Sequence, residues 1–389
     1  MNESTVQPTK ETFLSWVEIS KEALVHNLGQ FRSLAGEKKV LVVVKADAYG
    51  HGMLEISRIA LSAGADWLGV HSAEEGLNLR RGGITAPVLV MGYIPMALLP
   101  EAVAADLSIG AVNMETLSAL RKTLRKTGGR ARVHLEVETG LNRMGIRKAD
   151  LPETLEIVRA SGGSLLVEGV YTHFANIEDT TQHEFAMEQL RRFKEICEYL
   201  KSSVPEPLLR HTACTAAAIL FPDTYFDLLR VGIGAYGLWP SKETLITALQ
   251  GQKKLLDLKP VMTWKTRVAQ VKSVTPGESV GYGRSYRVTR PSRVAVIPVG
   301  YAEGYDRGLS NRGTVLIRGE EAPVVGRICM NMFMVDVTHI PEVALEDEVV
   351  LLGRQGVCRI PAETLAELAG TINYEIVSRV NPNLPRIVV

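Results

Sequence analysis

Residues 42–52, VVVKADAYGHG, decide how the first half of the chain is interpreted. The valines predict a buried strand, because β-branched side chains pack well on a pleated surface. The apolar run 40–45 ends on Lys45, and small, polar and glycine residues typical of a loop follow at once. A lysine at a strand end is most often a solvated residue, so the rest of the chain has to explain Lys45.

Seven further apolar runs of strand length follow, and longer helical patterns separate them. The runs are WLGVH (67–71), VLVMG (88–92), LSIGAV (107–112), RVHLEVE (132–138), LLVEGVYTHF (165–174), LLRHTAC (208–214) and LLRVGIGAYG (228–237). One separating stretch, 184–203, has apolar residues at a period close to that of a helix. Alternating strands and helices indicate a parallel sheet, and eight such units in roughly 200 residues are the size of a (β/α)8 barrel of the TIM type. We therefore predict an α/β fold with a barrel over 15–255.

The pattern changes near residue 256. The strand-like runs there are MTWKTRVAQVKSV (262–274), SRVAVIPVG (292–300), GTVLIRG (313–319), APVVGRICMNMFMVDV (322–337) and DEVVLLG (347–353). Only PAETLAELAG (361–370) has a helix pattern, with a proline start and a glycine stop. We predict a mostly antiparallel C-terminal β domain over 256–389. The early strand 13–20 fits either domain.

Composition and charge exclude several classes of protein. The chain has 389 residues and a net charge of +1, so its electrostatics favour neither a nucleic acid nor a membrane surface as a partner. No run approaches the length of about eighteen apolar residues that a membrane-spanning helix needs, and the polar N-terminus lacks a signal-peptide core. The scattered cysteines suit a reducing, cytoplasmic location and form no CxxC metal pattern. They are Cys197, Cys214, Cys329 and Cys358.

The residues at the carboxyl ends of the predicted barrel strands are where a barrel places its chemistry. They are Lys45, Glu136, Glu138, Arg143, His173, His211, Thr212, Thr215, Arg230, Gly232 and Gly234. The set is basic and rich in hydroxyls, and it contains neither a catalytic carboxylate pair nor a metal-binding spacing. A desolvated lysine forms Schiff bases, and hydroxyls with glycine N–H groups bind phosphate. Together they predict a site for pyridoxal 5'-phosphate (PLP).

Each of these signals has a structural alternative. A lone histidine such as His173 is more often a satisfied polar residue than a catalyst. The glycines of RVGIGAYG (230–237) could serve close packing alone. Thr215, which precedes alanines, could be no more than a helix cap. The shared position at strand ends is the stronger indication.

The motifs of the whole chain resemble the alanine racemase family of fold-type III PLP-dependent enzymes. The motifs are VVKADAYGHG (43–52), ETGLNRMGI (138–146), YTHFA (171–175), RVGIGAYGL (230–238), GYGRSY (281–286), PVGYAEGY (298–305), GRICMN (326–331) and INYE (372–375). The resemblance covers nearly the whole chain. It implies that PLP forms a Schiff base with Lys45, which would explain why a strand holds this lysine rigidly.

The resemblance also implies roles for other residues. Tyr49, Thr215 and Tyr374, with the backbone N–H groups of Gly232 and Ile233, match contacts to the cofactor phosphate. Arg143 matches an arginine near the cofactor's phenolic oxygen and the substrate carboxylate. Arg230 matches the residue that pairs with the pyridine nitrogen. His173 matches a residue that links Arg230 to a tyrosine. That tyrosine, Tyr282, matches a second catalytic base; Met330 matches a substrate contact, and Tyr301 and Tyr374 a narrow entrance. In this family Tyr282, Tyr301 and Met330 reach the site from a second subunit, so a homodimer with shared sites is implied.

The implied reaction is racemisation of alanine by two bases, Lys45 on one face of Cα and Tyr282 on the other. The resemblance further implies that D-alanine feeds bacterial cell-wall peptidoglycan. Three positions depart from the family pattern. Glu136 stands where a carbamylated lysine is frequent, and we expect its carboxylate to orient Arg143; Asn331 replaces an acid, and Thr215 replaces a common serine.

Other functions stay open from the sequence. A serine or broad-specificity racemase of the same family would share the catalytic residues, although the tyrosines of the entrance favour a small side chain. A D-amino-acid lyase or aldolase would need a metal, for which Cys329, His339 and Cys358 show no convincing spacing. A non-catalytic PLP carrier would lack the β domain.

Overall fold

The structure is a computed structural model that describes residues 10–201, 203–204, 207–251 and 255–389. The first nine residues, on which part of the signal-peptide interpretation depends, lie outside the described residues, as does residue 202 within the expected helix 184–203. The chain forms two compact units, which we describe separately. The β unit comprises residues up to Lys21, Tyr49–Gly52 and Pro260–Val389, and the barrel unit comprises Glu22–Ala48 and Met53–Lys259.

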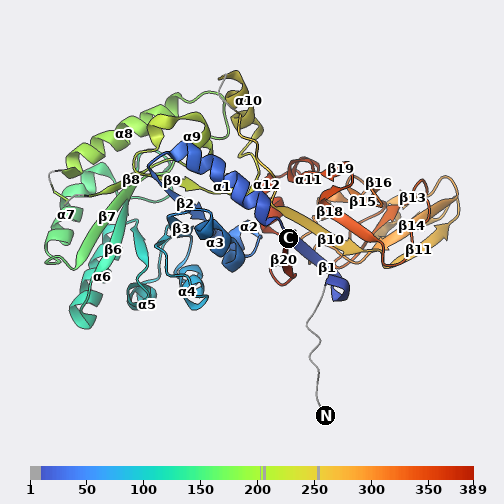
Figure 1. Cartoon of the computed structure of the whole chain (residues 1–389), viewed down its shortest axis with the longest axis horizontal. Coiled ribbons are helices and arrows are strands. Elements are labelled where there is room, and N and C mark those ends of the chain that lie inside the picture. Colours follow the sequence, from blue (N-terminus) through green and yellow to red (C-terminus); the bar gives the residue numbers. More distant parts are fainter. Residues whose placement is uncertain (1–9, 202, 205–206, 252–254) are drawn as a thin grey trace, which may run out of the picture. The chain divides into compact units, whose positions relative to one another are not determined.

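The barrel unit is built on an eight-stranded parallel sheet, as the sequence predicts (Figure 1). In the order of the sheet, its strands are β8 (Leu209–His211), β7 (Leu165–Tyr171), β6 (Ala131–Glu136), β5 (Ser108–Ala111), β4 (Val88–Val90), β3 (Trp67–Val70), β2 (Lys39–Val43) and β9 (Leu228–Val231). The two ends of this order also meet, because the Arg230 N–H donates to the Ala213 carbonyl at 3.0 Å. Every one of the eight predicted runs contains one strand, so the predicted TIM-type barrel is confirmed.

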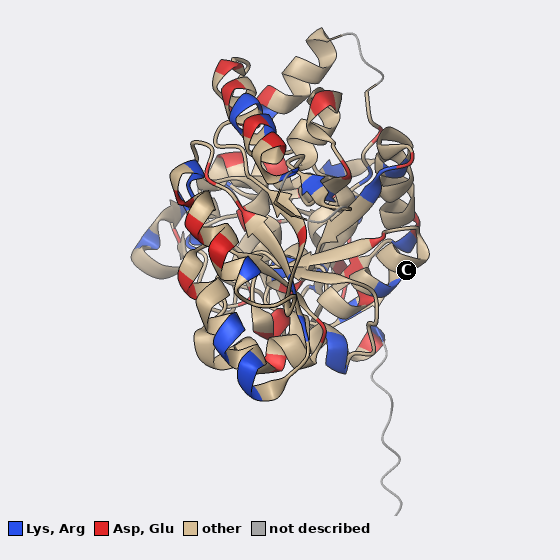
Figure 2. Cartoon of the chain, turned by 90° about the vertical axis from the view of Figure 1, so that its left-hand side faces the viewer, with Lys and Arg blue, Asp and Glu red and all other residues tan. Residues whose placement is uncertain are grey.

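One helix precedes the first strand of the barrel sheet, and the other helices follow its strands. In chain order, the helices are α1 (Lys21–Ala35), α3 (Met53–Ser62), α4 (Ala73–Arg81), α5 (Leu99–Ala104), α6 (Met114–Thr127), α7 (Leu151–Arg159), α8 (Glu184–Lys201), α9 (Thr215–Leu220) and α10 (Lys242–Gln250). Most of the Lys, Arg, Asp and Glu residues in view lie on helices and loops, while the strands inside are mostly of other residue types (Figure 2). In α8, Ala186, Leu190, Phe193 and Cys197 are buried, which is the apolar stripe that its period predicts.

Local capping explains where several helices begin. Ser72 and Glu75 form a reciprocal capping box at the start of α4, in which each side chain accepts from the other residue's backbone N–H. The Asn113 side chain accepts from the Thr116 N–H at the start of α6, and the Ser241 side chain accepts from the Thr244 N–H at the start of α10. Each cap marks the point where the loop after a barrel strand ends and the next helix begins.

The β unit is mostly antiparallel, as predicted. Its largest sheet has the order β16 (Glu320–Pro323), β15 (Thr314–Ile317), β18 (Glu348–Gln355), β10 (Met262–Arg267), β1 (Ser15–Ile19) and β20 (Arg386–Val388), with β19 (Cys358–Ile360) on β18. A second sheet holds β11 (Gln270–Val274), β14 (Ser292–Ile297) and β17 (Phe333–Asp336), and a third holds β12 (Ser279–Val280) and β13 (Tyr286–Arg287). The early strand β1 pairs antiparallel with β10 and parallel with β20.

The β unit contains one more helix than its sequence pattern suggests. The predicted helix is α11 (Ala362–Ala369), and α12 (Asn373–Ser378) follows it. The second helix is too short for its period to be visible, so INYE was interpreted only as a motif. Within the described residues, no helix is long and apolar enough to cross a membrane.

Candidate functional site

Lys45 follows β2 at the start of a left-handed turn, the segment α2 (Lys45–Tyr49) (Figure 1). The four residues after it have positive φ angles of 53, 52, 54 and 54°, although none is glycine. Left-handed backbone costs an L-residue roughly 1–2 kcal/mol, so surrounding contacts have to hold the turn. The Glu75 carboxylate accepts from the Ala46 N–H at 2.6 Å, and the Asp47 carboxylate accepts from the Met53 N–H at 2.8 Å. The turn therefore ends β2 abruptly and fixes the backbone of Lys45.

The Lys45 amine is half-buried and has no hydrogen bond or ion pair to any described residue. Burial lowers its pKa, and the nearby Arg143 guanidinium lowers it further, while Glu75 and Glu178 act in the opposite direction. A lysine with a depressed pKa is more often neutral, which is the form that acts as a nucleophile or base.

Arg230, the third residue of β9, is buried with 5% of its surface exposed. One terminal nitrogen, Nη1, donates to the His211 ring and carbonyl at 2.8 and 2.9 Å; the other, Nη2, donates to the carbonyls of Thr172 and Thr212 at 2.8 and 3.1 Å. No described residue accepts from its Nε–H. Burial lowers the pKa of this guanidinium, and no carboxylate forms an ion pair with it in the described chain.

His173 lies just beyond β7 and is neutral. Burial is the main cause that lowers its pKa, to about 3, and Arg230, Arg143 and Lys45 add to the effect. Its Nδ1 accepts weakly from Arg230 Nη2 at 3.4 Å. The sequence predicted a His173–Arg230 pair, and the structure indicates that Arg230, not His173, carries the positive charge of that pair.

Glu136 ends β6 and is buried, but its hydrogen bond goes to a residue that the sequence did not single out. The Tyr171 hydroxyl donates to Glu136 at 3.0 Å. Burial raises the pKa of Glu136, whereas Tyr171, Arg143 and Arg230 oppose this. Within the described part of the chain, no ion pair joins Glu136 to Arg143, so the expected orientation of Arg143 by a direct ion pair is not found.

Thr215 and the loop after β9 form a small polar cradle. The Thr215 hydroxyl accepts from the Gly232 N–H at 3.0 Å and lies 3.4 Å from the Gly234 nitrogen. Thr215 is the first residue of α9 and Cys214 is the capping position, so the simple helix-cap interpretation of Thr215 is wrong. A Cβ at Gly234 would lie 2.5 Å from Phe31 Cζ and 2.6 Å from Thr215 Cγ2. The loop can approach Thr215 only because position 234 has no side chain.

The structure brings Tyr49 and Tyr374 together within the β unit. Their ring centroids lie 6.1 Å apart, at an angle of 44°. The residue after Tyr49, Gly50, has a φ of 80° and packs so tightly that an added Cβ would overlap the Val377 carbonyl at the end of α12. This contact joins the predicted phosphate-contact residues, which are more than 300 positions apart in sequence.

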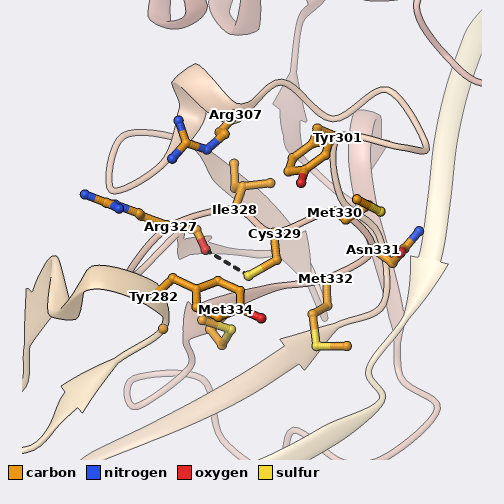
Figure 3. A pocket seen from close by; sticks show the side chains of 11 residues that line it. Tyr282, Tyr301, Arg307, Arg327, Ile328, Cys329, Met330, Asn331, Met332 and Met334 are labelled. Atoms are coloured by element: carbon orange, nitrogen blue, oxygen red, sulfur yellow. Dashed lines mark hydrogen bonds between the residues drawn. The ribbon is translucent and has the colours of Figure 1, made fainter.

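Tyr282, Tyr301 and Met330 line one cavity of the β unit, with a volume of about 820 Å³ (Figure 3). Figure 3 shows Tyr301 and Met330 on one side and Tyr282 on the other. In the single chain, 72% of Tyr282, 44% of Tyr301 and 56% of Met330 is exposed. The Tyr301 N–H donates to the Cys329 carbonyl at 3.1 Å. Large apolar side chains that gather on an exposed surface mark a contact site.

The departure at Asn331 has a local explanation. Its side-chain amide donates to the Glu303 carboxylate at 2.8 Å. An aspartate at this position would place two carboxylates against each other. Glu303 also accepts from the Gly300 N–H at 2.7 Å, so this pair stabilises the PVGYAEGY loop that carries Tyr301.

Sequence reasoning missed three residues of the barrel, His134, Glu168 and Tyr171, and it did not place His211 beside Arg230. Tyr171 stacks on His211 with a centroid distance of 4.9 Å, and Arg230 lies 5.4 Å over the Tyr171 ring. The available signal was polar residues at alternate positions of an otherwise apolar run, such as His134 and Glu136 in RVHLEVE. Barrel interiors are usually filled by branched aliphatic side chains, so this pattern predicts a polar layer. No group of three or more histidine, cysteine, aspartate or glutamate side chains among the described residues could hold a metal ion.

Models of known protein families match sequence in both units. The family described as "Alanine racemase, N-terminal domain" matches residues 19–240, and "Alanine racemase, C-terminal domain" matches residues 261–388. The alanine racemase of Leptospira interrogans is 37% identical over 383 residues, which cover 98% of this chain and 97% of that protein. The alanine racemase of Desulfosudis oleivorans is 39% identical over 386 residues, with 96% of each chain covered.

Solved structures agree with the sequence relatives. The alanine racemase of D-cycloserine-producing Streptomyces lavendulae superposes with a TM-score of 0.90 at 35% identity and covers 98% of both chains. The alanine racemase of Bacillus anthracis with bound L-Ala-P gives a TM-score of 0.90 at 34% identity, covering 98% of this chain and 96% of that one.

Proposed function

Because this chain belongs to the alanine racemase family, we propose that it interconverts L- and D-alanine with PLP as its cofactor. The observation that supports this most is Lys45, a half-buried amine without a hydrogen-bond partner, which together with Arg143 and Arg230 forms a cluster of cationic groups that act on His173. Such a cluster favours an anionic ligand, and PLP carries both a phosphate and a phenolate. The bound cofactor supplies an electron-withdrawing ring that makes the Cα–H of an attached amino acid acidic.

The residues of the barrel unit fit this cofactor. The Arg230 Nε–H, which no described residue accepts, suits the nitrogen of a pyridine ring. Arg230 cannot release its proton to that nitrogen, because a guanidinium stays protonated under all ordinary conditions. The cradle of Thr215, Gly232 and Ile233 contains a hydroxyl and backbone N–H groups, which suit a phosphate, and a bound phosphate would replace Thr215 as the acceptor of the Gly232 N–H. Tyr49 and Tyr374 are the further phosphate contacts that we propose.

Lys45 would bind the aldehyde carbon of the cofactor and, once the substrate displaces it, take up or return the proton at Cα. Its depressed pKa supports this double role, since a general base works best when its pKa lies near the working pH. Arg143 would bind the substrate carboxylate. Its position near Lys45 and His173 is supported by its effect on their pKa values.

A second base is required on the opposite face of Cα, and we propose Tyr282 from a second copy of the chain. The exposure of Tyr282, Tyr301 and Met330 in the single chain supports a homodimer in which these residues are covered and complete the site. Neutral His173 accepts from Arg230 through Nδ1, so its Nε2–H is free to donate to the Tyr282 oxygen. We further propose that the barrel within 15–255 and the β domain 256–389, which the early strand β1 joins, are the functional domains, and that the D-alanine serves peptidoglycan synthesis.

Racemisation in D2O tests the proposed function. The PLP-loaded protein is given each L-amino acid separately, D-isomers are followed by chiral chromatography, and Cα deuteration is followed by mass. We expect alanine to be racemised much faster than serine, lysine or arginine. Comparable turnover of several amino acids would instead indicate a broad-specificity racemase, and bound PLP without turnover would indicate a carrier.

Two variants test the proposed bases. Lys45→Ala should abolish exchange at Cα, whereas Tyr282→Phe should retain exchange of the proton that Lys45 handles but lose the D-product. The loss should be restored in part when inactive Lys45→Ala is mixed with inactive Tyr282→Phe, because a mixed dimer has one site with both bases. Full activity of Tyr282→Phe would refute the second base.

A further inference from the structure

A chain of hydrogen bonds runs through the interior of the barrel and ends on Arg230. The Arg230 Nη1 lies 2.8 Å from His211 Nδ1, the His211 Nε2 lies 2.9 Å from His134 Nδ1, and the His134 Nε2 lies 3.3 Å from a Glu168 oxygen. Both histidines are fully buried. None of these contacts is needed to close the barrel, since its strands pair through their backbones.

Arg230 determines which ring nitrogen of each histidine carries the proton in this chain of hydrogen bonds. A guanidinium can only donate, so His211 Nδ1 must accept. A neutral imidazole carries one proton, which is then on His211 Nε2 and is donated to His134 Nδ1. By the same reasoning the His134 proton is on Nε2 and is donated to Glu168. Burial lowers the pKa of both histidines, which supports their neutral forms.

Glu168 anchors the far end of the chain. Its carboxylate accepts from the Ser108 hydroxyl at 2.7 Å, and the Arg132 guanidinium lies 3.4 Å away. Ser108 is the first residue of β5 and Arg132 the second residue of β6, so this end lies in the amino-terminal half of the barrel. The chain therefore connects a carboxylate there with a guanidinium near the carboxyl ends of the strands, where barrels place their chemistry.

The His134 ring of this hydrogen-bond chain fits in the barrel because residue 169 is a glycine. A Cβ at Gly169 would overlap the His134 ring. On its other side the ring packs edge-on against Trp67, with a centroid distance of 5.4 Å. His134 is thus held in one orientation, and so is the imidazole of His211 that it accepts from.

We propose that Glu168, His134 and His211 are positioning residues that order the protons along this chain and hold the Arg230 guanidinium in one orientation. With both terminal nitrogens of Arg230 held by His211 and by backbone carbonyls, its Nε–H is the donor left for a ligand. The value of this arrangement for racemisation rests on the proposed function, in which the ligand there would be the pyridine nitrogen of PLP. The proton order itself does not depend on that function.

The proton order is tested by nitrogen NMR of the holoenzyme labelled with 15N in the histidine rings. We expect His134 and His211 to be neutral and protonated at Nε2 near neutral pH. His134→Leu should leave the His211 Nε2–H without an acceptor and shift its 15N resonance, while Arg230 keeps Nδ1 unprotonated. A proton on Nδ1 of either histidine in the unaltered protein, or an imidazolium, would overturn the proposal.

A pair of variants separates positioning from packing. Gln and Leu are similar in size, but only a glutamine at position 134 can accept from His211 with its oxygen and donate to Glu168 with its amide. We expect His134→Gln to keep kcat for alanine racemisation within about threefold, and His134→Leu to lower kcat at least tenfold with KM changed less than threefold. The absorption of bound PLP should change in His134→Leu only, because Arg230 loses its fixed orientation.

The outcomes are distinguishable from a failure of the proposed function. Equal loss of kcat in the two variants would show that His134 acts by packing alone and would refute the positioning role. An unaltered protein that binds PLP but racemises no amino acid would refute the proposed function, while the NMR spectrum would still decide the proton order.

Discussion

Acid should destabilise the barrel unit well before its carboxylates titrate. The fully buried His134 and His211 and the partly exposed His173 have pKa values that removal from water lowers, to about 3 for His173. In the unfolded chain a histidine has a pKa of about 6.5. Between those values the unfolded state binds more protons than the folded state, so stability falls as the pH falls below about 6.5.

The size of this loss follows from proton linkage. A histidine with a folded pKa well below 5.5 contributes about 1.4 kcal/mol between pH ~7.5 and pH ~5.5, so His173 and His211 together remove about 3 kcal/mol, and His134 adds to the loss. Glu136 acts in the opposite direction, because a raised folded pKa adds stability as the pH falls. Three histidines act against one carboxyl group, so we expect a net loss that is a large part of the stability of a typical domain.

Urea unfolding followed by far-ultraviolet circular dichroism measures this loss as a shift of the midpoint with pH. His134→Gln provides the control, because glutamine does not titrate: whatever its effect on stability at neutral pH, the pH-dependent loss should shrink. An unchanged midpoint between the two pH values, or an equal pH-dependent loss in His134→Gln, would refute the view that these histidines fold neutral.

Three further predictions concern single positions. Ala46→Gly should raise the free energy of unfolding by up to about 1 kcal/mol, because glycine adopts a φ of 53° without strain; a destabilised variant in urea unfolding would contradict this. Gly234→Ala should weaken PLP binding at least tenfold in a fluorescence titration, since its Cβ pushes Thr215 from the cradle, while Thr215→Ser should bind normally. Asn331→Asp should lower thermal stability at low salt by about 1 kcal/mol through repulsion by Glu303, and high salt should remove the difference.

Much of the fold was predictable because the barrel repeats one pattern. Each predicted strand run contains a strand, since a strand that is buried on both faces must be apolar along its whole length. Long helices such as α8 were predictable for a similar reason, because burial of one face imposes a period on the sequence. Short elements were not predicted. β12, β13 and α12 have two to six residues, which are too few to show a hydrophobic period.

For the candidate site, the sequence supplied residue types and motifs but not partners. Lys45 and Thr215 could be singled out because each stands at the end of an apolar run. That Glu136 accepts from Tyr171, or that Asn331 donates to Glu303, could not be foreseen, because these partners lie 35 and 28 positions apart and no local rule joins them.

By itself, then, the sequence determined the alternation of strands and helices, the family motifs and the identity of the reactive side chains. Those features are local, since hydrophobic period, turn residues and motif order can be read within a few positions of the chain. Only the tertiary structure decided the protonation of His173, the left-handed turn after Lys45 and the path from Glu168 to Arg230. Burial and hydrogen-bond direction depend on which strands become neighbours, and that is settled only when the barrel closes.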